Sequence, residues 1–278
     1  MTRLLNPIVL AFALSTLAFA DASAQGIRHS LGTGDRSPLS IQLGLGVEAE
    51  PEYVGARTIR RSASPEINLS YRTESLGTIA LGTEVGGLLW APLETPFFSA
   101  GMMVSYDSGR KDGPKGSGHR PGGARLRGMG SIGGAAAYGG FVSATIEGLE
   151  LSAYALKTPS GRGSGGAQGT LSLTVPIMAR HGVEMSLEAS LNAADRRYMQ
   201  AYFGVDALQS ERSGLRRHAA AGGLKSAGAT LEVSYALSKA WTLHGELGAE
   251  RLMGSAANSP VTERRVQPHE SLGLSYRF

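Results

Sequence analysis

Apolar and polar residues alternate one by one over long stretches of this chain, and few folds can use such a pattern. Between residues 39 and 49 the odd-numbered positions are leucine, isoleucine, valine or alanine, and the even-numbered positions are serine, glutamine, glycine or glutamate. The same period of two recurs at 66–72, 183–191, 230–237 and 241–250. Because successive side chains of a β-strand point to opposite faces, each stretch predicts a strand with one apolar and one polar face.

The length and the composition of these strands predict that the sheet lies in a membrane. Several approach the roughly 9–11 residues that a tilted strand needs to cross a bilayer. Their polar faces carry small residues and glutamate, as in a wet interior, and their apolar faces often end on an aromatic ring. In lipid every backbone N–H and C=O must be paired, so the sheet must close. We predict an all-β fold, a closed antiparallel transmembrane β-barrel, with a soluble β-sandwich as the alternative.

The connections between the strands predict their number. Tight turns are expected at 93–96, 147–148, 179–182 and 238–240, and they alternate with longer connections. Short turns on the periplasmic side and longer loops outside are typical of bacterial outer-membrane barrels. The segment 76–93 fits two short strands. We predict about twelve strands, with ten as the alternative.

The N-terminal residues 1–24 predict a secretory signal peptide. Arg3 precedes an apolar run over 4–20, and an A-x-A site at 22–24 predicts cleavage before Gln25. An uncleaved anchor helix is the alternative, but the apolar run is short for one. The barrel is expected within 25–278. The chain has no cysteine, so neither disulfides nor a lipidated cysteine contributes.

The last strand carries a pattern that resembles the C-terminal strand of bacterial outer-membrane proteins. Apolar residues alternate with small or polar ones up to the final aromatic ring, at Leu272, Leu274, Tyr276 and Phe278. The resemblance implies recognition by the outer-membrane assembly machinery and integral insertion into the lipid of a Gram-negative outer membrane. In a closed barrel the last strand pairs with the first, which removes both sheet edges.

Five blocks in order along the chain are similar to successive blocks of one family. They are PEYVGA at 51–56, SPEINLSYR at 64–72, SYDSGR at 105–110, YMQAYFGV at 198–205 and RLMGSAANSPVT at 251–262. They resemble the MltA-interacting protein family (MipA/OmpV), although the loop after residue 107 is more basic and glycine-rich than the family pattern. Members are described as scaffolds that join a murein lytic transglycosylase to a murein synthase. The resemblance therefore implies these two enzymes as partners.

The polar faces of the predicted strands should line the barrel interior. Their charged and titratable members are Glu48, Glu66, Arg72, Glu184, Glu188, Glu232, His244, Glu246 and Arg277. An excess of glutamate is compatible with a cation-preferring channel. We favour a packed network of ion pairs and hydrogen bonds, because about twelve strands enclose limited space.

The predicted outer loops are basic. Their cationic residues are Arg110, Lys111, Lys115, Arg120, Arg125, Arg127, Arg212, Arg216 and Arg217. Arginine forms bidentate contacts with phosphate, so contact with lipopolysaccharide is one interpretation, and plain solvation of the loops is the other. A formal net charge of +4 is too small to indicate a nucleic-acid partner.

The sequence predicts no catalytic residues, no cofactor site and no metal site. None of the six histidines has a neighbour at a metal-ligand spacing, and neither an H-E-x-x-H nor a G-x-S-x-G motif occurs. We therefore predict a protein that is not an enzyme. Three functions remain open: a murein-enzyme scaffold, a small-solute channel, and an adhesin or ligand-binding surface on the outer loops.

Overall fold

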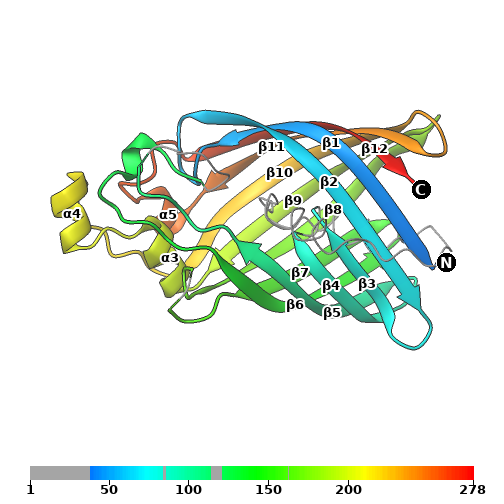
Figure 1. Cartoon of the computed structure of the whole chain (residues 1–278), viewed down its shortest axis with the longest axis horizontal. Coiled ribbons are helices and arrows are strands. Elements are labelled where there is room, and N and C mark those ends of the chain that lie inside the picture. Colours follow the sequence, from blue (N-terminus) through cyan, green and yellow to red (C-terminus); the bar gives the residue numbers. More distant parts are fainter. Residues whose placement is uncertain (1–37, 84–85, 114–120, 162) are drawn as a thin grey trace, which may run out of the picture.

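Twelve antiparallel strands close into a barrel in a computed structural model that describes residues 38–83, 86–113, 121–161 and 163–278 (Figure 1). Each strand pairs with its neighbours in sequence, and β1 pairs with β12 to close the sheet. The predicted barrel and the predicted strand number are confirmed. The predicted signal peptide, 1–24, and its cleavage site lie outside the described residues. The strands are β1 Leu39–Pro51, β2 Ile59–Thr73, β3 Gly77–Gly82, β4 Gly87–Glu94, β5 Phe98–Asp107, β6 Ala135–Ile146, β7 Leu149–Lys157, β8 Ala167–Arg180, β9 Val183–Ala194, β10 Gly223–Ala236, β11 Trp241–Leu252 and β12 Val266–Arg277.

The outer surface of the barrel is apolar, as the alternation predicts. Leu45 is 64% exposed, and Leu187 and Leu247 on other strands are also exposed. Residues of the opposite parity, such as Gln42 and Glu188, are buried although they are polar. The apolar parity therefore faces outward, toward lipid, and the polar parity faces the interior. Among the described residues, no helix has the length and apolarity that crossing a membrane requires.

The seam between β1 and β12 runs in regular register, with Leu45 opposite Leu274. At the C-terminal end of β12, the backbone N–H of Phe278 donates to the carbonyl of Ile41 at 3.0 Å. The ring of Tyr276 packs edge-on against Trp241 and against Phe278, with centroids 5.0 and 4.8 Å apart. The terminal aromatic residues therefore form a small girdle at one rim of the barrel.

The two ends of the barrel differ in the length of their connections. At one end, here the turn end, short turns join the strands. In two of these turns Glu147 and His181 have positive φ angles of 52° and 55°, and each is followed by a glycine of positive φ. Two successive residues of positive φ form the tight turn that matches the twist of a hairpin. The opposite end, the loop end, carries the long connections at 108–134, 158–166, 195–222 and 253–265.

Short helices stand in the loops of the loop end (Figure 1). They are η1 Ala124–Leu126, α3 Arg196–Phe203, α4 Ala207–Ser213 and α5 Gly254–Ala257. Side chains cap the two longer ones: the Asp195 carboxylate accepts from the N–H of Tyr198, and Asp206 forms a capping box with Gln209. α4 ends at Gly214, which adopts the left-handed conformation.

The long loops pack together into one structured unit, which we call the loop cap: residues 52–58, 108–113, 121–134, 195–222 and 253–265. Its central apolar cluster draws on four separate loops and contains Tyr53, Ala56, Leu126, Met129, Val205, Leu215 and Val261. A second cluster, which includes Met199 and Phe203 of α3, joins the cap to the ends of β9 and β11. The cap therefore has its own hydrophobic core beyond the strands.

Candidate functional site

One side of the barrel interior is a polar wall, formed by the inward side chains of β8 to β12, β1 and β2. Its central contact is between Glu66 on β2 and His244 on β11, with Oε1 and Nε2 2.7 Å apart. β1 and β12 lie between these two strands, so the contact crosses the interior. Glycines on the intervening strands make room: a Cβ added at Gly273 would lie 2.2 Å from the Glu66 carboxylate, and one at Gly44 would lie 2.6 Å from it.

Other inward acidic groups are also held by hydrogen bonds. Arg72 of β2 donates to Glu94 at 2.5 Å, and Thr78 donates to the second oxygen of the same carboxylate at 2.5 Å. Ser62 donates to Glu48 at 3.0 Å, and Ser186 donates to Glu232 at 3.2 Å. Glu188 is buried on the same wall. Of the predicted inward residues, the structure therefore brings Glu66 and His244 together, and it bonds Arg72, Glu48 and Glu232 to residues outside the predicted set.

Three of the predicted inward residues are more accessible than the others. Glu184 is exposed at the turn end of β9, Arg277 is exposed at the turn end of β12, and Glu246 is exposed on β11. The structure also adds Glu150, which is 2% exposed on β7 and accepts from Ser143 at 2.9 Å. The interior therefore contains more hydrogen-bonded acidic groups than the sequence predicted.

The opposite side of the interior is an apolar wall, formed by inward residues of β3 to β7. It consists of Ala80, Leu89, Ala91, Met103, Ala137, Phe141, Tyr154 and Leu156. Leu89 is fully buried, whereas its neighbours Leu88 and Trp90 are exposed on the outer surface. The sequence prediction of an all-polar lining missed this wall. On β4 and on parts of the neighbouring strands the inward positions are apolar as well as the outward ones, so the alternation carries little signal there, although inward polar groups such as Ser99 and Glu150 lie on the same strands.

The basic residues of the loops have diverse surroundings. Arg127, Arg212 and Arg217 are exposed on the loop cap. Arg125 donates to the carbonyl of Pro260 at 3.0 Å, and Arg216 donates to the carbonyl of Asn258 at 2.6 Å, so both join different loops of the cap.

Arg110 and Lys111 are less accessible than these arginines. Lys111 is half-buried, and its backbone N–H donates to the carbonyl of Pro121 at 2.8 Å. Arg110 lies inside the cap and is 3% exposed. Lys115 and Arg120 lie outside the described residues.

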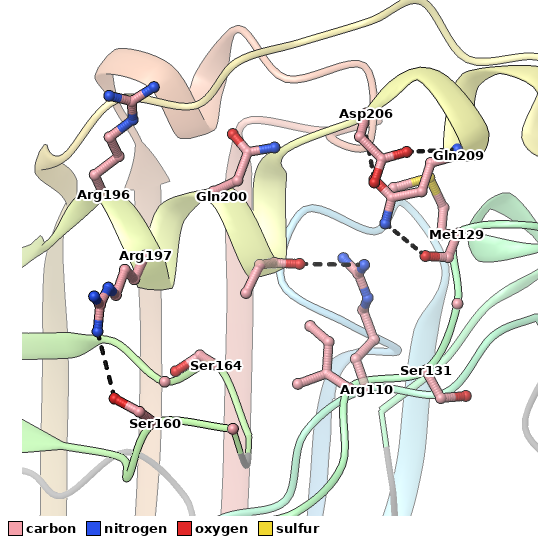
Figure 2. Close-up of a pocket in the computed structure, with 15 residues that line it drawn as sticks. Arg110, Met129, Ser131, Ser160, Ser164, Arg196, Arg197, Gln200, Asp206 and Gln209 are labelled. Carbon is pink, nitrogen blue, oxygen red and sulfur yellow. Dashed lines mark hydrogen bonds between the residues drawn. The ribbon is translucent and has the colours of Figure 1, made fainter.

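A pocket of about 920 Å³ opens in the loop cap, between α3 and the loops that follow β5 and β7 (Figure 2). One face of α3 lines it with Arg196, Arg197, Gln200 and Ala201, a spacing that places these residues on the same side of a helix. The other face, with Met199 and Phe203, is buried in the cap. Arg110 lines the pocket beneath the C-terminal end of α3.

The groups that accept hydrogen bonds from Arg110 are neutral, and the Asp112 carboxylate attracts the guanidinium from beyond ion-pair distance. Its Nη1 and Nη2 donate to the carbonyls of Tyr202 and Ala201 at 2.5 and 3.5 Å. Burial lowers the pKa of the Arg110 guanidinium from its usual value, because a charge is costly away from water. Burial likewise raises the pKa of the Tyr202 hydroxyl, which donates to Asp107 at 2.5 Å. This part of the cap is therefore a largely buried, hydrogen-bonded environment.

Within the described ranges, no group of three or more histidine, cysteine, aspartate or glutamate side chains is arranged to hold a metal ion. Six inward glutamates have a guanidinium, imidazole, hydroxyl or amide partner: Glu48, Glu66, Glu94, Glu150, Glu232 and Glu250. The arrangement can order side chains and bind ions by charge.

The comparison with known families decides the identity of the chain. The family model described as MltA-interacting protein MipA matches residues 43–278, which include every strand from within β1 to the C-terminus. The chain belongs to this family. The resemblance of the five sequence blocks is thereby confirmed. No curated protein matches this MipA-family chain.

Solved outer-membrane proteins resemble this MipA-family protein in architecture at low sequence identity. OprB of Pseudomonas putida is 9% identical with a TM-score of 0.40, over 78% of this chain and 59% of that one. TodX, a toluene transporter of P. putida, is 10% identical with a TM-score of 0.40, over 94% and 95% of the two chains. CymD, a monoaromatic hydrocarbon channel, is 11% identical with a TM-score of 0.43, over 94% of each. These values carry no inference about function.

The MipA-family protein is an integral outer-membrane β-barrel. Its family and fold are those of a non-enzymatic barrel. In such barrels the short turns face the periplasm and the long loops face outward. The loop cap and its pocket therefore lie on the cell exterior, and the girdle around Phe278 lies at the periplasmic rim.

Proposed function

We propose that this MipA-family protein is a non-conducting scaffold that holds murein-remodelling enzymes at the periplasmic face of the outer membrane. The observation that carries the proposal is the filled interior of the barrel. Many inward side chains on both walls are buried, including Phe141 at 3% exposure on the apolar wall and Ser275 at 1% on the polar wall, although Glu246 is exposed. A water-filled pore would leave inward side chains accessible.

The family description supplies the class of partner. It names an interaction with MltA, and the sequence resemblance implies that this partner is a murein lytic transglycosylase, with a murein synthase as the second enzyme. Binding then involves the turn end. Basic side chains are exposed there on consecutive hairpins, with Arg180 at the β8–β9 turn, Lys239 at the β10–β11 turn and Arg277 at the end of β12. Charge at an interface mainly governs the rate and the specificity of association.

The test measures binding of each purified murein enzyme to the refolded protein in detergent. The double variant Arg180→Glu, Lys239→Glu is expected to weaken binding of the transglycosylase by about tenfold. Arg212→Glu, an equally exposed change at the loop end, is the matched control and should leave binding unchanged.

Planar-bilayer recordings test the other half of the proposal. A scaffold with a filled interior is expected to give no stable single-channel steps. Regular conductance steps that require the folded protein would favour the channel function instead. Failure of both murein enzymes to bind would refute the scaffold.

We also propose lipopolysaccharide contacts for the exposed arginines of the cap. Arg127, Arg212 and Arg217 are exposed on the outward side, and arginine suits bidentate contacts with phosphate. Replacing all three by glutamine is expected to reduce the gain in unfolding temperature that lipopolysaccharide gives the protein in micelles. An unchanged gain would refute the contact.

A further inference from the structure

The pocket in the loop cap is lined by a buried cation, Arg110, that no carboxylate of the described residues contacts at ion-pair distance. Arg110 is 3% exposed, and no carboxylate of the described ranges lies within 4.0 Å of its guanidinium. Its two terminal nitrogens donate to neutral carbonyls, and its Nε has no protein acceptor. Buried charges in proteins are normally paired or bound to a ligand.

The helix that lines the pocket, α3, also favours an anionic ligand near its N-terminal end. Arg196 and Arg197 are the first two residues of α3, and its first turn contains no acidic residue. Cations at this end of a helix are disfavoured by the helix dipole, whereas an anion there is favoured. Arg197 points toward the loop after β7 and donates to Ser160 at 3.4 Å (Figure 2). Two cationic side chains therefore accompany Arg110 along one face of α3.

The rest of the lining supplies groups that can hydrogen-bond the hydroxyl groups of a ligand. Ser131, Ser160 and Ser164 supply hydroxyls, and Gln200 supplies a side-chain amide. The one carboxylate of the lining, Asp206, already accepts from the backbone N–H of Gln209 at 2.8 Å as the cap of α4. A volume of about 920 Å³ lies within the range of small-molecule pockets.

We propose that this pocket is a binding site for an anionic sugar, a saccharide that carries a phosphate or carboxylate group. Arg197, in the first turn of α3, binds the anionic group, Arg110 adds positive charge from beneath the C-terminal end of the helix, and the serine hydroxyls and Gln200 bind sugar hydroxyls. The ligand comes either from the phosphorylated core of lipopolysaccharide or from a soluble sugar in the medium. This external site goes beyond the proposed scaffold function, which concerns the periplasmic end.

Calorimetric titration of the refolded full-length protein in detergent tests the proposal. The probes are glucose 6-phosphate and galacturonate, with glucose and inorganic phosphate as comparisons. Arg197→Gln and Arg110→Gln are each expected to weaken binding of the charged sugars by about tenfold or more, the effect of losing a charge-assisted contact. Arg57→Gln removes an exposed arginine of the same cap that does not line the pocket, and it should bind as the unchanged protein does.

Arg197 is exposed, so its replacement tests the site even if Arg110→Gln fails to fold. Glucose binding as tightly as glucose 6-phosphate would overturn the proposal, and so would equal losses in all three variants. Inorganic phosphate binding as tightly as glucose 6-phosphate would overturn the assignment to a sugar. Absence of binding by both charged sugars at millimolar concentration would overturn the site. Competition by lipopolysaccharide added to the micelles identifies the lipid as the source, and undiminished binding identifies a soluble sugar.

Discussion

Replacing Leu187 by arginine is expected to destabilise the barrel strongly, whereas the same change at Ser186 should be tolerated. Leu187 lies on the outer surface of β9, opposite Leu231 of β10 and Val175 of β8. An arginine on the lipid face near the bilayer midplane costs roughly 2–4 kcal/mol. This cost lowers the ratio of folded to unfolded protein by about 30- to 900-fold.

The interior gives an arginine at position 186 a different environment. The Ser186 hydroxyl donates to Glu232 at 3.2 Å, and Glu188 is buried on the same wall. Opposite unit charges 4 Å apart attract each other by about 4 kcal/mol at an effective dielectric constant of 20. That attraction offsets the lost hydration of the guanidinium, so we expect the free energy of unfolding to change by no more than about 1 kcal/mol.

The assay is reversible urea unfolding of the refolded variants in lipid vesicles, supported by heat-modifiable gel mobility. Val233→Arg and Ser234→Arg provide a second outward–inward pair on β10. The reasoning is refuted if the inward member of each pair loses as much free energy of unfolding as the outward member. These strands would then be buried on both faces.

Three further predictions concern the interior, the last strand and the N-terminus. Gly273→Val is expected to lower the free energy of unfolding by about 1–3 kcal/mol, because its Cβ would lie 2.2 Å from the Glu66 carboxylate oxygen that contacts His244. Gly245→Val, whose Cβ meets no atom closer than 3.1 Å, is the control and should cost less in the same unfolding assay. Deleting Phe278 should reduce the outer-membrane level far more than deleting the loop residue Gly165, and equal levels on immunoblots would contradict this. Mass spectrometry of the outer-membrane form should find an N-terminus at or near Gln25, and a mass that retains residues 1–20 would rule out the signal peptide.

The barrel was predictable because its signal is local. Along β1 and β9 to β12 one parity is apolar and the other is small or polar, so the faces follow directly from the sequence. The apolar wall was not predictable in this way. β4, for example, places Leu89 and Ala91 inward and Leu88 and Trp90 outward, and parity alone cannot separate two apolar faces.

The helices of the loop cap had a local signal that the alternation did not use. Asp206 is followed three residues later by Gln209, and Gly214 stands where the helix ends, a pattern that predicts α4. The pocket had no such signal. Arg110 reaches the carbonyls of Ala201 and Tyr202, about ninety residues away, so its burial depends on how distant loops pack.

Contacts within the loop cap join the loop after β1 to the β11–β12 connection and the start of β12, outside the membrane. Tyr53, in the first loop, donates to the carbonyl of Val261 at 3.1 Å, and the backbone N–H of Gly55 donates to Gln267 at 2.8 Å. These contacts bridge the β1–β12 seam, and they can form only after the final hairpin has been synthesised and inserted. These contacts of the cap are therefore among the last to form during assembly. A nascent or truncated chain without β12 would leave the first loop undocked and recognisable to proteases at the cell surface.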